Sequence, residues 1–184
     1  MGASTATALL GVKTEKVISA LQKCPVISGR LEKVYAGNFD VYVDFAHTPD
    51  GLVKVLSAVK NNTKGGVICV FGCGGNRDTG KRREMGKVSG SLSDLTVITS
   101  DNPRYEEPMD IIFEIEKGVL EVTKNYVIIQ DRTDAIEYAL NVAKKGDAII
   151  IAGKGSEKYQ EILGIKLPYN DKDTVKELLK GKIL

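Results

Sequence analysis

The sequence predicts an α/β fold: a Rossmann-like, doubly wound, mainly parallel mixed sheet with helices on both faces. Its continuous apolar runs are typical of strands that are buried on both faces. They lie at 66–71, 95–99, 126–130 and 148–152. Helical stretches separate these runs, and this alternation is the pattern of a parallel sheet. A hairpin before them makes the predicted sheet mixed.

Length and composition indicate one domain with a full hydrophobic core and a short appendage. The chain has 184 residues, of which 42% are hydrophobic and 27% charged. A net charge of +2 gives no electrostatic reason to bind nucleic acid or a membrane, so we expect neither partner. No apolar run approaches the ~20 residues that span a bilayer, and the start of the chain lacks the regions of a signal peptide.

The cysteines and the histidine narrow the class of protein further. Three cysteines without framework spacing suit a reducing cytosol, so we expect a cytoplasmic protein. We also expect the protein to be a monomer. We interpret Cys69 and Cys73, which flank a strand end, as small buried residues. The single histidine argues against a dedicated zinc site, and we expect no metal site in the chain.

The first segment, residues 3–24, is predicted to form two short helices. Its apolar residues recur at helical intervals: Leu9, Leu10, Val17, Ile18 and Leu21. Gly11 interrupts the pattern, and a second helix is predicted to begin with a cap near Thr14. Two short helices cannot bury both of their faces alone. We therefore interpret residues 1–28 as a helical remnant of a preceding domain.

The elements that follow alternate in type. Strands at 31–36 and 39–45 flank Gly37-Asn38, a plausible hairpin turn. Helices are predicted at 50–60, 81–92, 109–122 and 133–144. A short strand near 165–167 is predicted to add to the sheet. A last helix is predicted at 173–180, with Asn170 or Asp171 as its cap.

Polar, glycine-bearing loops follow four of the predicted strands. These loops lie at 44–50, 72–78, 100–104 and 153–157. In open sheets of this type, ligands bind outside the carboxyl ends of the strands. Four such loops on one rim are more than the fold needs for turning corners, so we expect a binding site there.

The loop at 72–82 resembles a phosphate-binding loop but lacks a necessary residue. Gly75, Gly80 and Lys81 match that motif, whereas Arg82 stands where a hydroxyl must bind magnesium. The third glycine of a dinucleotide fingerprint is also missing. Arg77 leaves two interpretations open, either a flexible turn or a guanidinium that binds a carboxylate. We interpret the charge run at 81–84 as a solvated helix face.

The segment Asp101-Asn102-Pro103-Arg104 has the chemistry of an amino-acid site. Pro103 stiffens the turn. Asp101 can accept from an ammonium group, Asn102 can donate and accept, and Arg104 can pair with a carboxylate. Together these groups complement a zwitterion. The alternative is an Asn-Pro turn at a strand end, with the aspartate capping a helix.

Two other loops add candidate residues. Gly153 to Glu157 is similar to an anion nest, but the Glu157 carboxylate suits an amine or a hydroxyl better than an anion. His47 lies between Asp44 and Asp50 at a strand end, a position that only modestly favours a functional role over a packed or exposed histidine.

Taken in this order, the clusters resemble the C-terminal half of the MurE-type Mur ligases, the UDP-N-acetylmuramoyl-tripeptide synthetases. The matching segments are Gly29-Arg30-Leu31-Glu32, Val43-Asp44-Phe45-Ala46-His47-Thr48-Pro49-Asp50, Phe71-Gly72-Cys73-Gly74-Gly75-Asn76-Arg77-Asp78-Thr79-Gly80-Lys81-Arg82, Asp101-Asn102-Pro103-Arg104 with Glu107-Pro108, Asp131-Arg132 with Ala135-Ile136, and Ala152-Gly153-Lys154-Gly155 with Glu157, Tyr159 and Gln160. The resemblance covers almost the entire chain.

This resemblance implies an ATP-dependent amide ligase of peptidoglycan synthesis. In that reaction ATP, with Mg²⁺, phosphorylates the D-glutamate carboxylate of a UDP-linked muramyl dipeptide, and the amine of a diamino acid attacks the acyl phosphate. The positions that match the family's diamino-acid site are Arg77, Asp101, Asn102, Pro103, Arg104, Gly153 and Glu157. The arginine of the turn implies meso-diaminopimelate rather than lysine, because lysine has no distal carboxylate. Arg30, Asp44 and His47 match residues that face the nucleotide.

The sequence also departs from the family pattern. Ser156 replaces a histidine of the family, and Asn76 replaces an aspartate. The family's ATP-binding loop, carbamylated lysine and UDP-sugar domain match nothing in this chain, so we expect residues 29–184 to be a C-terminal domain that is inactive alone and holds no catalytic residue. The alternatives are the corresponding domain of another Mur ligase or of a folylpolyglutamate synthetase, and a stand-alone amino-acid-binding module.

Overall fold

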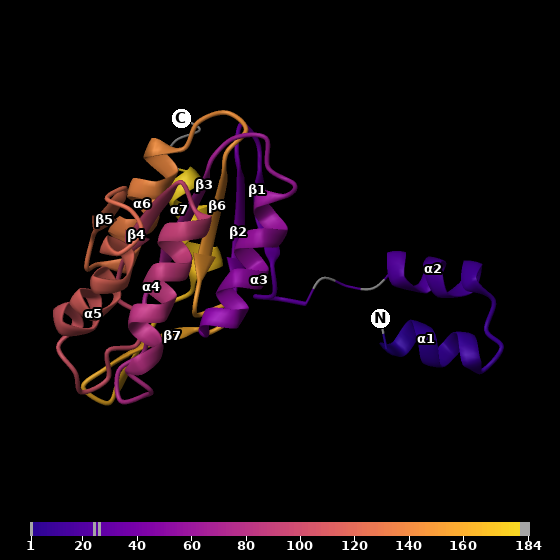
Figure 1. Cartoon of the computed structure of the whole chain (residues 1–184), viewed down its shortest axis with the longest axis horizontal. Coiled ribbons are helices and arrows are strands. Elements are labelled where there is room, and N and C mark those ends of the chain that lie inside the picture. The colour runs from indigo at the N-terminus through magenta and orange to yellow at the C-terminus, as the bar shows by residue number, and fades with distance from the viewer. Residues whose placement is uncertain (1, 24, 26, 181–184) are drawn as a thin grey trace.

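A computed structural model describes residues 2–23, 25 and 27–180 of the chain, with side chains from residue 5 onward. Figure 1 shows a sheet covered by helices, with two N-terminal helices set apart from it. In chain order the elements are α1 (Gly2–Leu9), α2 (Thr14–Gln22), β1 (Glu32–Ala36), β2 (Asp40–Asp44), α3 (Pro49–Lys60), β3 (Val67–Phe71), α4 (Gly80–Leu92), β4 (Leu95–Ile98), α5 (Pro108–Leu120), β5 (Tyr126–Ile128), α6 (Arg132–Val142), β6 (Ala148–Ala152), β7 (Tyr159–Ile162), β8 (Ile165–Pro168) and α7 (Asp171–Lys180).

The main sheet has six strands in the order β1-β2-β6-β3-β4-β5. Strand β1 is antiparallel to β2, and the other strands are parallel, so the predicted mixed sheet is confirmed. The last residues of the central strands are in register, because Ala152 of β6 pairs with Asp44 on one side and with Phe71 on the other. The loops that follow these strands therefore begin side by side.

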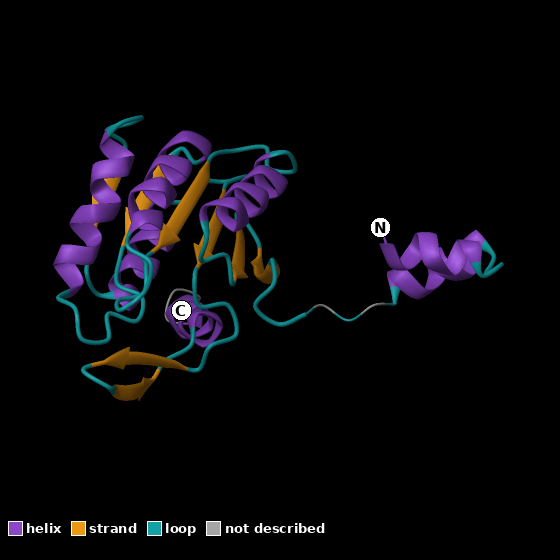
Figure 2. Ribbon diagram, turned by 60° about the horizontal axis from the view of Figure 1, so that its bottom comes forward, coloured by secondary structure: helices purple, strands orange, loops and turns teal. Residues whose placement is uncertain are grey.

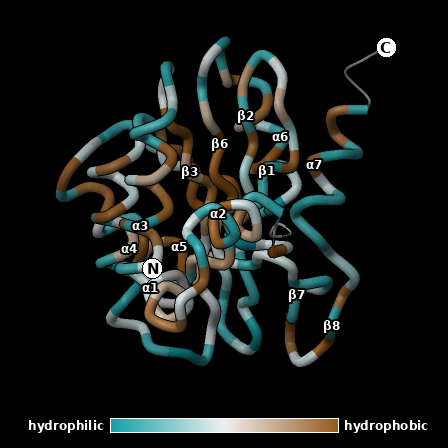
Figure 3. The backbone as a smooth tube through the Cα atoms, turned by 90° about the vertical axis from the view of Figure 1, so that its right-hand side faces the viewer, coloured by the Kyte–Doolittle hydropathy of each residue, from teal (hydrophilic) through white to brown (hydrophobic). Residues whose placement is uncertain are grey.

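Helices cover both faces of the sheet, as predicted (Figure 2). On one face, α3, α4 and α5 pack against alternate strand residues such as Cys69 and Phe71. On the other face, α6 and α7 pack against Ile68 and Val70. Strand β3 is buried along its whole length, which explains its uninterrupted apolar sequence. In Figure 3 hydrophobic segments gather in β3 and β6 at the centre of the sheet.

One of the local predictions is wrong and two are confirmed. The strand predicted at 165–167 is β8, which pairs with β7 in a separate two-stranded hairpin instead of extending the main sheet (Figure 3). The second helix begins at Thr14, as predicted, with its cap position at Lys13, which makes no side-chain capping hydrogen bond. Asn170 caps α7 as predicted, since its Oδ1 accepts from the Asp173 amide at 3.1 Å.

The N-terminal helices carry exposed apolar side chains. Leu9 is 85% exposed and Leu10 is 82% exposed, and no residue of α2 is buried. Cys24, the last residue of the predicted helical segment, lies outside the described residues. No helix in the described part of the chain is long and apolar enough to span a membrane.

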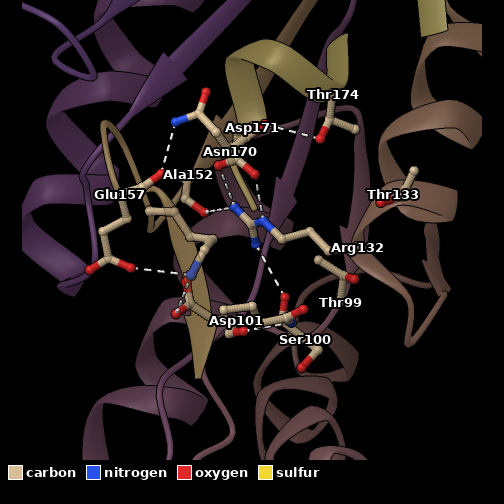
Figure 4. Close-up of polar contacts among 12 residues, drawn as sticks. Thr99, Ser100, Asp101, Arg132, Thr133, Ala152, Glu157, Asn170, Asp171 and Thr174 are labelled. Carbon is tan, nitrogen blue, oxygen red and sulfur yellow. Dashed lines mark hydrogen bonds and ion pairs between the residues drawn. The ribbon is translucent and has the colours of Figure 1, made fainter. Parts of the chain in front are cut away.

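A buried ion pair joins α6 to α7 behind the strand ends (Figure 4). Arg132 donates through Nε and Nη2 to the two carboxylate oxygens of Asp171, at 2.8 and 2.9 Å. The same guanidinium donates to the carbonyls of Ser100 at 3.3 Å and Ala152 at 2.9 Å. Both charged side chains are completely buried. The pair therefore ties the ends of β4 and β6 to the last helix.

We predict that Asp171→Asn destabilises the fold by about 3–5 kcal/mol, because it leaves a buried guanidinium without a counter-charge. The measurement is urea denaturation of the variant and the wild type. Asp50→Asn is the control: it breaks the exposed pair with Lys54 and is expected to cost less than about 0.5 kcal/mol. A cost for Asp171→Asn as small as that of the control would contradict the prediction.

Candidate ligand-binding site

A cavity of about 350 Å³ lies at the carboxyl ends of the strands. Its lining combines arginine and lysine side chains with carboxylates and glycine backbone. The lining residues are Phe45, His47, Gly72, Cys73, Gly74, Arg77, Asp78, Lys81, Asp101, Asn102, Arg104, Gly153 and Glu157. The fold thus brings most of the sequence-predicted site residues together. Pro103, Arg30 and Asp44 are not among the lining residues.

The turn after β4 is buried and firmly held. Asp101 and Asn102 are 8% and 3% exposed, and Pro103 is buried. The amide of Gly75 donates to the Asn102 carbonyl at 2.9 Å. Asp101 does not cap the next helix, because the cap position of α5 is Glu107. The alternative that Asp101 caps a helix is therefore excluded, and its carboxylate is available for another role.

Strand β7 also makes hydrogen bonds with the turn after β4. Gln160 donates through Nε2 to the Asp101 carbonyl at 2.7 Å, and the Glu161 amide donates to Asn102 Oδ1 at 2.9 Å. The backbone of Arg104 forms a parallel bridge with Ile162. This contact was not predicted from the sequence, because the only strand predicted in this region, at 165–167, corresponds to β8 and not to β7.

The Arg104 guanidinium is fixed on two sides. Nη1 donates to the Gly75 carbonyl at 2.7 Å, and Nε pairs with Glu161 Oε2 at 3.2 Å. Within the described residues, Nη2 makes no hydrogen bond. The guanidinium is therefore oriented by the protein and keeps donors for a ligand carboxylate. Because the side chain is already ordered, it loses less conformational entropy when a ligand binds.

Asn102 and Glu157 are linked by a buried lysine. Lys154 is completely buried, and its ammonium donates to Asn102 Oδ1 at 2.8 Å and to Glu157 Oε2 at 3.1 Å. Asn102 also donates through Nδ2 to Glu157 Oε2 at 3.0 Å. Lys154 belongs to one of the segments that resemble the family, but the sequence alone indicates no role for it. Its position between two glycines was the available signal.

Glycine is required at the start of the Lys154 loop. Gly153 has a φ of 115°, and a Cβ at this position would lie 2.7 Å from Asp101 Oδ2. Gly155 has a φ of 53° and lies against Phe45. These two conformations let the loop pass close to the Asp101 carboxylate and turn Lys154 into the interior.

The glycine loop after β3 presents Arg77 to the cavity. Arg77 forms no hydrogen bond or ion pair with the described part of the chain, so its guanidinium is available. The preceding Asn76 has a φ of 51°, and its Oδ1 accepts from the Tyr105 amide at 3.1 Å. Asparagine and aspartate both tolerate this conformation, which explains how Asn76 can replace the family's aspartate.

The interpretation of residues 81–84 as a solvated helix face is wrong for Arg82. Its side chain is 2% exposed and pairs with Glu106 at 2.8 Å and Glu114 at 3.0 Å. Arg82 also donates to the Gly74 carbonyl at 3.4 Å. Arg82 is buried because two carboxylates from the segment 106–114 compensate its charge, and it thereby braces the glycine loop. Lys81 lines the cavity and donates to the His47 carbonyl at 2.8 Å.

Of the residues predicted to face a nucleotide, His47 lines the cavity, whereas Arg30 and Asp44 contact the neighbouring residues Phe45 and Ala46. The Asp44 carboxylate accepts from the amides of Leu31 at 2.6 Å and Ala46 at 2.7 Å, so it orders the loop around itself. The Arg30 guanidinium stacks 4.7 Å from the Phe45 ring centre. The His47 ring meets the same phenylalanine edge to face, at a centroid distance of 4.7 Å.

The two described cysteines are buried, as predicted. Burial raises the pKa of the Cys73 thiol to about 12, so this cavity-lining residue is a thiol at neutral pH.

Ser156, the second departure from the family pattern, is exposed, and it does not line the cavity. The described residues contain no group of three His, Cys, Asp or Glu side chains that could hold a metal ion.

Residues 29–155 match the family model of the Mur ligase glutamate ligase domain. The chain belongs to the Mur ligase family. It is 48% identical over 180 residues to the UDP-N-acetylmuramoyl-L-alanyl-D-glutamate–2,6-diaminopimelate ligase of Alkaliphilus metalliredigens, with 97% of this chain and 36% of the relative covered. It is 50% identical over 174 residues to ligase 1 of the same name from Clostridium acetobutylicum, with 92% and 36% covered.

Solved structures of Mur ligases also match this chain. A structure of a UDP-N-acetylmuramoyl-L-alanyl-D-glutamate–2,6-diaminopimelate ligase matches with a TM-score of 0.81 and 33% identity, covering 99% of this chain and 37% of that one. The UDP-N-acetylmuramate–alanine ligase of Thermotoga maritima, with a TM-score of 0.67 and 16% identity, shares the fold; 97% of this chain and 35% of that one are covered. This Mur ligase chain spans about a third of the length of the relatives it matches.

We predict that the Arg82–Glu106 contact makes the stability of the Mur ligase domain sensitive to acid. The hydrogen bond from Arg82, assisted by the Asn76 amide, lowers the pKa of Glu106 below its ordinary value of 4.5. The stabilisation is therefore present above the unfolded-state pKa and is lost as the pH falls through the folded-state pKa. Urea unfolding from pH 7 to pH 3 should show a smaller acid loss for Glu106→Gln than for the wild type. Equal losses in the two proteins would contradict this assignment.

Proposed function

We propose that this chain is the amino-acid-binding domain of an ATP-dependent ligase that joins a diamino acid to UDP-N-acetylmuramoyl-L-alanyl-D-glutamate. The observation that carries the proposal is the composition of one cavity. Arg77 and Arg104 supply guanidinium donors, and Asp101 and Glu157 supply carboxylates, all on the same rim. A zwitterionic amino acid needs both kinds of partner.

The diamino acid that fits these groups best is meso-diaminopimelate. This molecule carries an ammonium and a carboxylate at each end, whereas lysine carries only an ammonium at its distal end. Two arginines in one cavity can pair with both carboxylates of diaminopimelate, and lysine would leave one guanidinium without a partner. The printed names of the relatives, which are 2,6-diaminopimelate ligases, support the same choice.

We assign residues 29–184 to this domain and residues 1–28 to the end of a preceding one. The exposed apolar side chains of α1 and α2 support the division, because Leu9 and Leu10 would be buried against a further domain. ATP and Mg²⁺ would be bound mainly by such preceding parts of the ligase. Arg30, Asp44 and His47 would face the nucleotide from this chain, and the 184 residues alone are expected to turn over no ATP.

The matches to folylpolyglutamate synthases do not favour a second function. They have TM-scores of 0.53 and 0.55 at 16 and 19% identity, which shows a shared fold alone. A stand-alone amino-acid-binding module would use the same cavity and requires no ATP. Amide formation by the intact ligase that contains this chain separates the two functions.

We predict that meso-diaminopimelate is preferred over L-lysine by a factor of at least about 10, which corresponds to the lower limit of about 1.5 kcal/mol for a charge-assisted hydrogen bond. The measurement is a pair of calorimetric titrations of the intact ligase, with the two amino acids in the same buffer. Equal or reversed affinities would refute the choice of diaminopimelate and leave the ligase assignment standing.

We predict that Arg104→Ala raises the KM for the diamino acid by roughly 10- to 150-fold, equivalent to about 1.5–3 kcal/mol of lost charge-assisted hydrogen bonding. Arg83→Ala is the matched control, because Arg83 is exposed on α4 and pairs with Glu121, which is not among the cavity-lining residues. The control should leave the KM unchanged. An unchanged KM in Arg104→Ala would place Arg104 outside the site.

A further inference from the structure

We propose that Lys154 is a positioning residue of the diamino-acid site, whose buried ammonium sets the orientation of Asn102 and Glu157 without itself touching the ligand. The inference rests on the proposed function for the identity of the ligand. The positioning role itself is a property of the chain and can be tested with no ligand present.

Lys154 lies behind the cavity wall and not on it. Asp101, Asn102 and Glu157 all line the cavity, and Lys154 does not. Its side chain is 0% exposed, and its ammonium lies 5.9 Å from the centre of the Tyr159 ring. Lysine is almost never fully buried unless its charge is paired. The burial of this ammonium therefore depends on the groups around it.

The partners of Lys154 are residues of the proposed site. Its Nζ lies 2.8 Å from Asn102 Oδ1, 3.1 Å from Glu157 Oε2 and 3.9 Å from Asp101 Oδ1. One cation is thus shared by three side chains that line the cavity. It offsets the repulsion between the two carboxylates and allows both to remain close to each other on the same wall.

The Lys154 ammonium also helps to fix the orientation of the Asn102 side-chain amide. Oδ1 accepts from two donors, the Lys154 ammonium at 2.8 Å and the Glu161 amide at 2.9 Å. A flipped amide would direct its NH₂ group at both donors and lose both bonds. The observed orientation directs Nδ2 to Glu157 Oε2 at 3.0 Å. Oε2 is therefore used by the protein, and Oε1 makes no hydrogen bond to the described residues.

This arrangement predicts which oxygen of Glu157 accepts a hydrogen bond from the amino group of a ligand. With Oε2 held by Lys154 and Asn102, the carboxylate cannot rotate freely, and Oε1 is the oxygen left for a ligand ammonium. Removing the lysine would leave Glu157 Oε2 held by Asn102 alone and Asn102 Oδ1 held by the Glu161 amide alone, so both side chains would be less firmly oriented. The loss would appear as weaker ligand binding, although no ligand contact had been removed.

The first experiment follows the Asn102 side chain by ¹⁵N NMR in the chain of 184 residues without ligand. In Lys154→Met, which keeps the length of the side chain but removes the ammonium, we expect hydrogen exchange of the Asn102 NH₂ group to be at least about 10-fold faster than in the wild type, the factor for losing about 1.4 kcal/mol of protection. Lys158→Met is the matched control, because Lys158 is an exposed lysine four positions later, and it should leave the exchange unchanged. Unchanged exchange in Lys154→Met would overturn the proposal.

The wild-type protein provides a second measurement that does not depend on how the variant folds. The Lys154 ammonium protons should exchange slowly enough to be detected and should show nuclear Overhauser contacts to Glu157 or Glu161. An ammonium that exchanges as fast as that of Lys158 would overturn the proposal on its own.

The ligand experiment separates this proposal from the proposed function. Titration of the intact ligase with meso-diaminopimelate should show at least about 10-fold weaker binding for Lys154→Met, equivalent to about 1.4 kcal/mol, and no change for Lys158→Met. In Glu157→Gln, the further loss on adding Lys154→Met should be smaller, because the lysine acts through Glu157. Full additivity would overturn the positioning role. Failure of every protein, wild type included, to bind the amino acid would refute the proposed function, and the NMR results would still decide the role of Lys154.

Discussion

The contact on which the site depends is the buried pair of Arg132 and Asp171. One guanidinium binds the Asp171 carboxylate and the carbonyls of Ser100 and Ala152. These carbonyls stand immediately before the Asp101 turn and the Gly153 loop. Two of the loops that line the cavity are thus fixed to one cation in the protein interior. An exposed pair could not impose this order, because water and side-chain entropy weaken it.

A second layer of buried charge lies closer to the cavity. Arg82 braces the glycine loop through Glu106, and Lys154 connects Asn102 to Glu157. Arg82 is paired with carboxylates from the segment 106–114, and Lys154 is paired with Glu157 of its own loop and with Asp101 of the turn after β4. Arg77 differs from these residues, since its guanidinium has no partner among the described residues. The site therefore combines prearranged groups with one cation that is free to meet a ligand.

The sequence predicted the sheet and the position of the site because both leave local signals. Buried parallel strands such as β3 are continuous apolar runs, and polar loops at strand ends stand out against them. Burial of Arg82 could not be predicted, since its partner Glu114 lies 32 residues away. The contact of Lys154 with Asn102 spans 52 residues and exists only in the folded chain. Strand β7 is half-buried and β8 is exposed, and nothing in their sequence indicates that β7 would pair with the backbone of Arg104.

If the cavity binds a diamino acid between its arginines and its carboxylates, a crystal structure of the protein soaked with meso-diaminopimelate will show it there. We expect electron density in the cavity, with a ligand carboxylate on Arg104 or Arg77 and a ligand ammonium on Glu157 Oε1 or Asp101. Density at another place on the molecule, or a ligand in the cavity that contacts none of these four side chains, would contradict it.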